Sequence, residues 1–173
     1  MIFNNNLIKF FKRHNLYNEE MFCYFSENSN MIDYNDDEQR IFIGTFYILD
    51  KNNKLIKFYL NIPYVYDDKT MLISIHEIVH GILLYNKLNK KINLGIDYEA
   101  LPMLYEKIYI NEVNTPELIR YGKWLDSLIG EKNYEYIFGL NVRDELLKNY
   151  NYDINKMNRL VKKLSKKYEK LKK

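Results

Sequence analysis

The stretch from Met71 to Leu84 has apolar side chains on nearly every side of a helix, and this limits the fold more than any other feature of the chain. A helix that is apolar all round has to be covered by protein on every side. Asp67 and Asp68 stand directly before it and are of the residue type that caps helix N-termini. The sequence therefore predicts a buried helix that begins after these aspartates. The 173 residues suit a single domain, and we expect residues 1–173 to form one.

Two β-strands are expected before this helix. The stretches Arg40 to Leu49 and Leu55 to Val65 are rich in β-branched and aromatic residues, and Asp-Lys-Asn-Asn at 50–53 is typical of a turn. This pattern predicts an antiparallel hairpin. Pro63 cannot donate to a β-ladder, so it predicts an edge position or a bulge at the end of the second strand.

Helices are expected over the rest of the chain. Near the start, apolar residues at helical spacing predict a short helix that ends around His14, with His14 itself exposed. A second helix is predicted after Asn18, and the polar stretch Glu27 to Gln39 is predicted to be an exposed loop. After the buried helix, further helices are predicted at about 99–111, 116–128, about 134–150 and 154–173. Trp124 is expected in the core. The predicted fold class is α+β, a small antiparallel sheet followed by a mostly helical body.

Composition limits the cellular setting and the partners. The single cysteine, Cys23, stands among aromatic residues and is expected to be a packed thiol, which favours a reducing compartment. No stretch reaches the 18 apolar residues of a membrane span, and the first residues do not resemble a secretory signal. We therefore expect a cytoplasmic protein. The net charge is +3, from 26 basic and 23 acidic residues, which is too small to favour nucleic acid as a partner.

The buried helix carries His-Glu-Ile-Val-His at residues 76–80. Histidines four residues apart lie on one face of a helix, so His76 and His80 can both bind one Zn²⁺. Glu77 stands beside the first of them and can take a proton from a water that the metal activates. Two imidazoles and a carboxylate on an apolar helix need compensation, and a metal ion supplies it. The alternative is that both histidines are packed in the core and hydrogen-bonded.

A catalytic zinc needs a third protein ligand and an open position for water. The chain has no histidine after His80, so this ligand has to be an acidic residue. The candidates are Asp97, Glu99, Glu106 and Glu112. Glu99 is preferred, because the 18 residues between His80 and Glu99 let the chain finish one helix and begin another that faces it. Glu106, on the same helical face two turns later, is expected to orient a histidine or to line the cleft.

This pattern resembles the gluzincin group of zinc metallopeptidases, and the 18-residue gap is the spacing of its aminopeptidase branch. Residues 97–102, Asp-Tyr-Glu-Ala-Leu-Pro, followed by Glu106, are similar to the Asp-Phe-x-Glu-x-Pro-Ser stretch of the oligoendopeptidase branch. That branch has a longer gap and places its proline one residue nearer the glutamate, so Glu106 stays open as an alternative ligand. The resemblance covers about residues 55–112. It implies a zincin-like body and an edge strand, here Leu55 to Val65, that holds an extended substrate.

By this resemblance the reaction is zinc-dependent hydrolysis of a peptide or protein, with His76, His80 and Glu99 as ligands and Glu77 as the general base. One alternative is a catalytically silent zinc-binding module with a regulatory or interaction role. Another rests on the lysine-rich helix predicted for residues 154–173, which could dock on an anionic surface, pair with a partner helix, or simply pack on the body with solvated lysines. The sequence does not indicate an oligomeric state.

Overall fold

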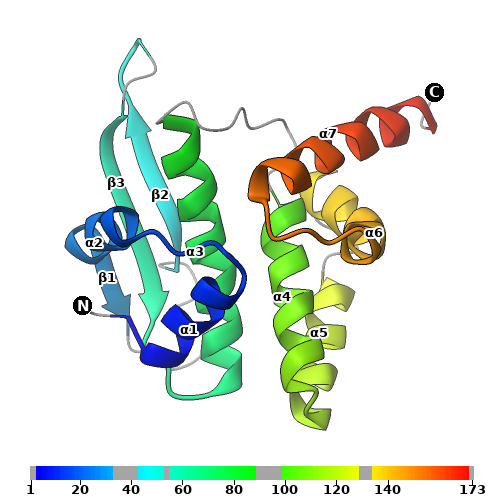
Figure 1. Ribbon diagram of the computed structural model, residues 1–173, viewed down its shortest axis with the longest axis horizontal. Coiled ribbons are helices and arrows are strands. Elements are labelled where there is room, and N and C mark those ends of the chain that lie inside the picture. The colour runs from blue at the N-terminus through cyan, green and yellow to red at the C-terminus, as the bar shows by residue number, and fades with distance from the viewer. Residues whose placement is uncertain (1–2, 33–42, 53–54, 89–98, 129–133, 172–173) are drawn as a thin grey trace. The chain divides into compact units, whose positions relative to one another are not determined.

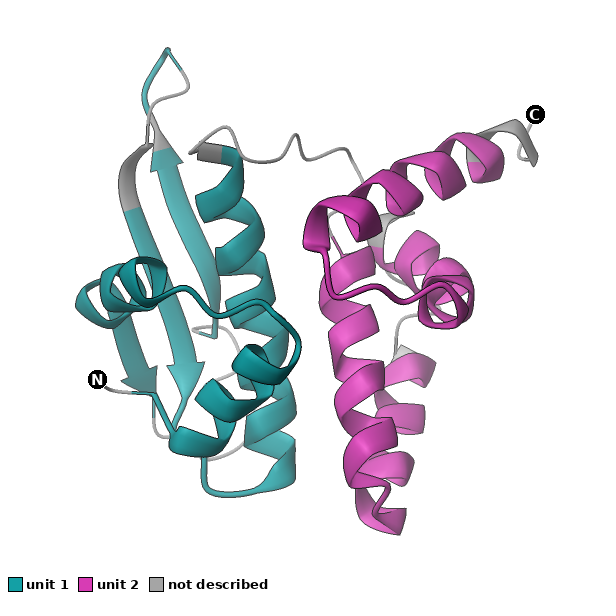
Figure 2. Cartoon of the chain, in the orientation of Figure 1, with its two compact units in different colours: residues 1–91 teal, residues 92–173 magenta. Residues whose placement is uncertain are grey.

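The computed structural model describes residues 3–32, 43–52, 55–88, 99–128 and 134–171 (Figure 1). The elements in chain order are α1 (Asn5–Arg13), α2 (Glu19–Glu27), β1 (Ser29–Ile32), β2 (Gly44–Leu49), β3 (Leu55–Pro63), α3 (Asp68–Leu88), α4 (Ala100–Val113), α5 (Pro116–Leu128), α6 (Tyr134–Lys148) and α7 (Ile154–Leu171). The predicted α+β class is confirmed. The chain divides into two compact units, residues 1–91 and 92–173 (Figure 2). The single domain stays a prediction.

The sheet of the first unit has three strands in the order β1-β3-β2. The predicted β2–β3 hairpin is confirmed: the two strands are antiparallel, with Thr45 opposite Leu60. The prediction of a wholly antiparallel sheet was wrong, because β1 pairs parallel to β3 within the segment expected to be a loop. β3 is the central strand, but its pairing with β2 ends at Asn61, so among the described residues its end at Pro63 pairs with β1 alone, in line with the predicted edge position. Pro63 is tolerated in the central strand because it is the last ladder residue, opposite Ile32, and the next residue, Tyr64, donates its N–H to the Ile32 carbonyl at 3.0 Å.

One face of β3 forms the core of this unit together with α3. Phe58, Leu60 and Ile62 alternate along β3 and are buried, as the two-residue period of a strand requires. Phe25 of α2 stacks on Phe58 with ring centroids 5.6 Å apart. Gly81 of α3 lies against this pair, since a Cβ atom there would be 3.3 Å from the Phe25 ring. Close packing at Gly81 therefore fixes α3 against both α2 and the sheet.

The predicted helix starts are confirmed where side chains cap the helices. Asn18 accepts a hydrogen bond from the N–H of Met21 at 2.9 Å, and Asp67 accepts one from the N–H of Thr70 at 2.7 Å. α5 has the predicted bounds, Pro116–Leu128, and Thr115 accepts from the N–H of Leu118 at 3.3 Å. The loop prediction for residues 33–39 lies outside the described residues.

Three predictions of side-chain burial were wrong. His14 is only 3% exposed, because it continues the inward face of α1 by one more turn, and its ring packs against that of Phe10 with centroids 4.5 Å apart. Trp124 is 39% exposed and stacks on Tyr121 at the surface of α5. Cys23 is exposed, because α2 turns its neighbour Phe22 inward instead.

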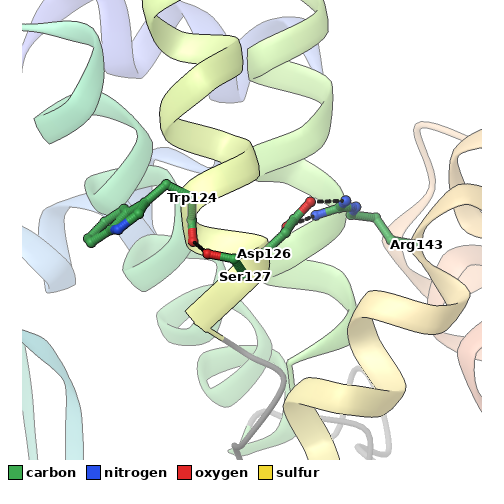
Figure 3. Close-up of polar contacts among 4 residues, drawn as sticks. All are labelled: Trp124, Asp126, Ser127 and Arg143. Carbon is green, nitrogen blue, oxygen red and sulfur yellow. Dashed lines mark hydrogen bonds and ion pairs between the residues drawn. The ribbon is translucent and has the colours of Figure 1, made fainter.

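The second unit is helical, and α4 packs against α5, α6 and α7. Gly139 lets α6 approach the start of α4, since a Cβ atom there would lie 3.4 Å from the Ala100 backbone. α5 and α6 are joined by a two-point ion pair between Asp126 and Arg143 (Figure 3), with both N···O distances 2.7 Å. These hydrogen bonds raise the pKa of Arg143. No helix among the described residues combines the length and the apolar composition needed to cross a membrane, as predicted, while the cytoplasmic location stays a prediction.

The Arg143–Asp126 pair provides a test of the second unit. Arg143→Lys keeps the charge but cannot make two parallel N–H···O bonds, and we expect it to lower the free energy of unfolding by about 1 to 3 kcal/mol. Urea unfolding of the full chain measures this. Arg120→Lys, at an exposed position of α5, is the control and should change the free energy of unfolding by about 0.5 kcal/mol or less. Equal effects of the two substitutions would contradict a stabilising role for the pair.

Candidate metal centre

His76 and His80 lie one turn apart on α3, and the Nε2 atoms of their rings point toward each other. Their Nε2 atoms are 3.1 Å apart, and the two rings are inclined by 69° with centroids 4.8 Å apart. His80 is only 5% exposed, whereas His76 is partly exposed. The convergence that the four-residue spacing predicts is therefore present within one rigid helix.

The spacing of these two nitrogens fits a zinc ion. Two imidazole nitrogens that each bind zinc at about 2.0 to 2.1 Å, with a tetrahedral angle between them, lie about 3.3 Å apart. The observed 3.1 Å needs only a small adjustment of the side chains. The same distance also suits a hydrogen bond between two neutral imidazoles, which is the packed-core alternative. Metal binding distinguishes the two, because it requires both Nε2 atoms to be unprotonated.

Glu77 is fixed by a residue of the sheet. The hydroxyl of Thr45, on β2, donates to the backbone carbonyl of Glu77 at 2.8 Å and lies 3.4 Å from its carboxylate oxygen Oε2. Glu77 is partly exposed, so its carboxylate can reach a water or a substrate. No sequence motif indicates this role of Thr45. Only the register of β2 against β3, together with the packing of α3 on the sheet, identifies this residue.

Glu99, the preferred third ligand, belongs to the second unit and directly precedes α4. Its carbonyl accepts the N–H of Met103 at 3.1 Å, so its backbone already takes part in the helix. Its side chain makes no capping hydrogen bond to this helix and is only 6% exposed. A buried carboxylate that does not cap its own helix has the chemistry of a cation ligand.

The other acidic candidates have different surroundings. Glu106 is half-buried on α4, and its charge contributes to raising the pKa of Arg143. That contribution gives Glu106 an electrostatic role within the second unit. Glu112 is exposed and adds to the negative field at Tyr150. Asp97 lies outside the described residues.

Two tyrosines of the second unit have strongly shifted pKa values. Burial raises the pKa of Tyr105 well above its usual value, and the ring of Tyr105 lies edge-on to that of Tyr150, with centroids 6.1 Å apart. Burial also raises the pKa of Tyr150, to about 12. Both groups therefore stay protonated at neutral pH.

No protein-family model, curated protein or solved structure matches this chain. The likeness to gluzincin peptidases accordingly rests on the motif residues and their spacing.

The paired Nε2 atoms predict that each chain binds about one zinc ion through His76 and His80. Protein purified without added metal and then dialysed against limiting zinc should retain it, and zinc at about 100 times its dissociation constant should stabilise the fold by about 2.7 kcal/mol. His76→Ala and His80→Ala should each abolish both effects. Zinc per chain is measured by elemental analysis, and the stabilisation by thermal unfolding.

His14→Asn is the control for this experiment, because it removes the remaining histidine of the chain. It is expected to lower the melting temperature through lost packing while leaving the zinc content unchanged. Failure of the wild type to bind zinc would show that His76 and His80 are a packed, hydrogen-bonded pair.

Proposed function

We propose that the protein is a zinc-dependent peptidase of gluzincin type, in which His76 and His80 bind the metal and Glu99, as the resemblance implies, is the third ligand. The observation that carries this proposal is the convergence of the two Nε2 atoms on a helix that also presents Glu77. The motif glutamate is intact and partly exposed, as a general base must be. Both features belong to one helix of the first unit.

The residues of the motif have separate tasks. The zinc ion supplies a Lewis acid that polarises the scissile carbonyl and makes water more acidic. Glu77 accepts the proton of the attacking water and passes it to the leaving amine, so the same carboxylate acts first as base and then as acid. Thr45 holds the backbone of Glu77 and limits where this carboxylate can move.

An extended peptide has a suitable place beside Glu77. Among the described residues β2 pairs with β3 alone, which leaves its other edge for a further strand. The contact between Thr45 and Glu77 joins β2 directly to the motif helix. We therefore infer that β2, and not β3 as the resemblance implied, is the strand that aligns the substrate by main-chain hydrogen bonds.

Glu99 rather than Glu106 is proposed as the third ligand. Its side chain is the more buried of the two, and Glu106 instead contributes to the electrostatics of Arg143. Glu99→Gln should weaken zinc binding about 10- to 100-fold or more, because it removes a charged ligand, whereas the matched Glu106→Gln should change it by about threefold at most. Competition with a fluorescent zinc chelator measures both constants. The reverse order of effects would make Glu106 the ligand.

Glu77→Gln tests catalysis separately from metal binding. The amide keeps the shape of the side chain but cannot accept a proton, so we expect full zinc content and a loss of about 10²- to 10⁴-fold in the hydrolysis of unfolded casein. Glu112→Gln, at an exposed position, is the control and should retain activity. If the zinc-loaded wild type hydrolyses neither casein nor a mixed peptide library, the chain is instead the catalytically silent zinc-binding module.

A further inference from the structure

Charge is distributed very unevenly along this chain. From Ile154 onward there are nine basic residues and one acidic residue, a net charge of +8. The whole chain has 26 basic and 23 acidic residues, so residues 1–153 have 17 and 22, a net charge of −5. The modest total of +3 therefore hides a strongly basic C-terminal segment that the peptidase chemistry does not use.

The inner face of α7 is used for packing. Met157 and Val161 are buried where α7 contacts α4 and α6. The ring of Tyr168 lies edge-on to that of Phe138, with centroids 5.5 Å apart, and its hydroxyl accepts a hydrogen bond from the side chain of Asn141 at 3.2 Å. Met157, Val161 and Tyr168 thus pack within the second unit and are not available for insertion into a bilayer.

The outer face of α7 is a row of cations, here called the basic face. It consists of five exposed residues: Lys156, Arg159, Lys163, Lys166 and Lys167. Their successive separations of three, four, three and one residue place them on one side of the helix, over about 16 Å of its length. None of the five forms an ion pair with an acidic side chain of the described residues. Figure 2 shows the later turns of α7 extending away from α4.

We propose that the basic face docks the protein on an anionic lipid bilayer surface. Lysine-rich clusters on one side of a helix are attracted to anionic headgroups. A flat surface can meet all five cations of a straight helix at once. The net negative charge of residues 1–153 is repelled by the same surface, which restricts contact to the basic face.

The composition of the basic face favours lipid headgroups over nucleic acid. Four of its five residues are lysines, which act as point charges and do not provide the two-point recognition of arginine. None of the five is aromatic, so the face offers no side chain on which a base could stack. Binding through this face should therefore depend on surface charge and salt, and not on the identity of a base.

Sedimentation with lipid vesicles tests this proposal on the full, zinc-loaded chain. The protein should bind vesicles containing about 30 mol % phosphatidylserine, but not pure phosphatidylcholine, and binding should be lost between about 0.05 M and 0.3 M salt. Lys163→Gln/Lys166→Gln/Lys167→Gln should reduce the partition coefficient about 100-fold, at about fivefold per lysine. Lys51→Gln/Lys87→Gln/Lys123→Gln removes the same charge from exposed positions elsewhere and should reduce it about threefold at most.

Three results would overturn the proposal: no binding to anionic vesicles, an equal loss in both triple variants, or tighter binding to a short DNA or RNA duplex than to vesicles at the same salt concentration. Circular dichroism checks that both variants are folded. Vesicle binding does not require zinc or hydrolysis, so its failure is distinguishable from failure of the proposed peptidase activity.

Discussion

Burial of α3 is the constraint on which the first unit depends. Its apolar residues surround the helix, so stability requires cover from β2 and β3 and from α1 and α2. Phe25 and Phe58 pack so closely at Gly81 that a Cβ atom there would already be in tight contact. The two histidines and Glu77 are residues of this helix, which core packing holds in place. Their geometry therefore follows from core packing, and a metal ion would meet nitrogens that already converge.

Features that depend on local sequence were predicted well. The hairpin, the caps at Asn18 and Asp67, and the bounds of α5 all follow from residue types at short separations. The pairing of His76 with His80 is also local, because four residues make about one turn of helix.

Features that depend on long-range pairing were not predictable in this way. The parallel pairing of β1 joins Ser29 to Leu60, which are far apart in the chain, and nothing in the polar residues around Ser29 indicates a strand. Thr45 became part of the candidate site through the same sheet, since its place opposite Leu60 brings its hydroxyl to Glu77. His14 is a different case. Its spacing from Phe10 indicates the buried face, whereas the charged neighbours Lys12 and Arg13 favour the exposure that was predicted.

The acidic residues of α4 show how environment separates side chains of one type. Glu99 and Glu106 occupy one helical face by spacing alone, and the sequence leaves both open as ligands. In the structure Glu99 is buried at the helix start, where it does not cap its own helix, while Glu106 is half-buried and contributes to the field at Arg143. A carboxylate that already stabilises a guanidinium would give up that interaction on binding a metal, which disfavours Glu106 as the ligand. Spacing does not separate the two glutamates, so it is burial that favours Glu99.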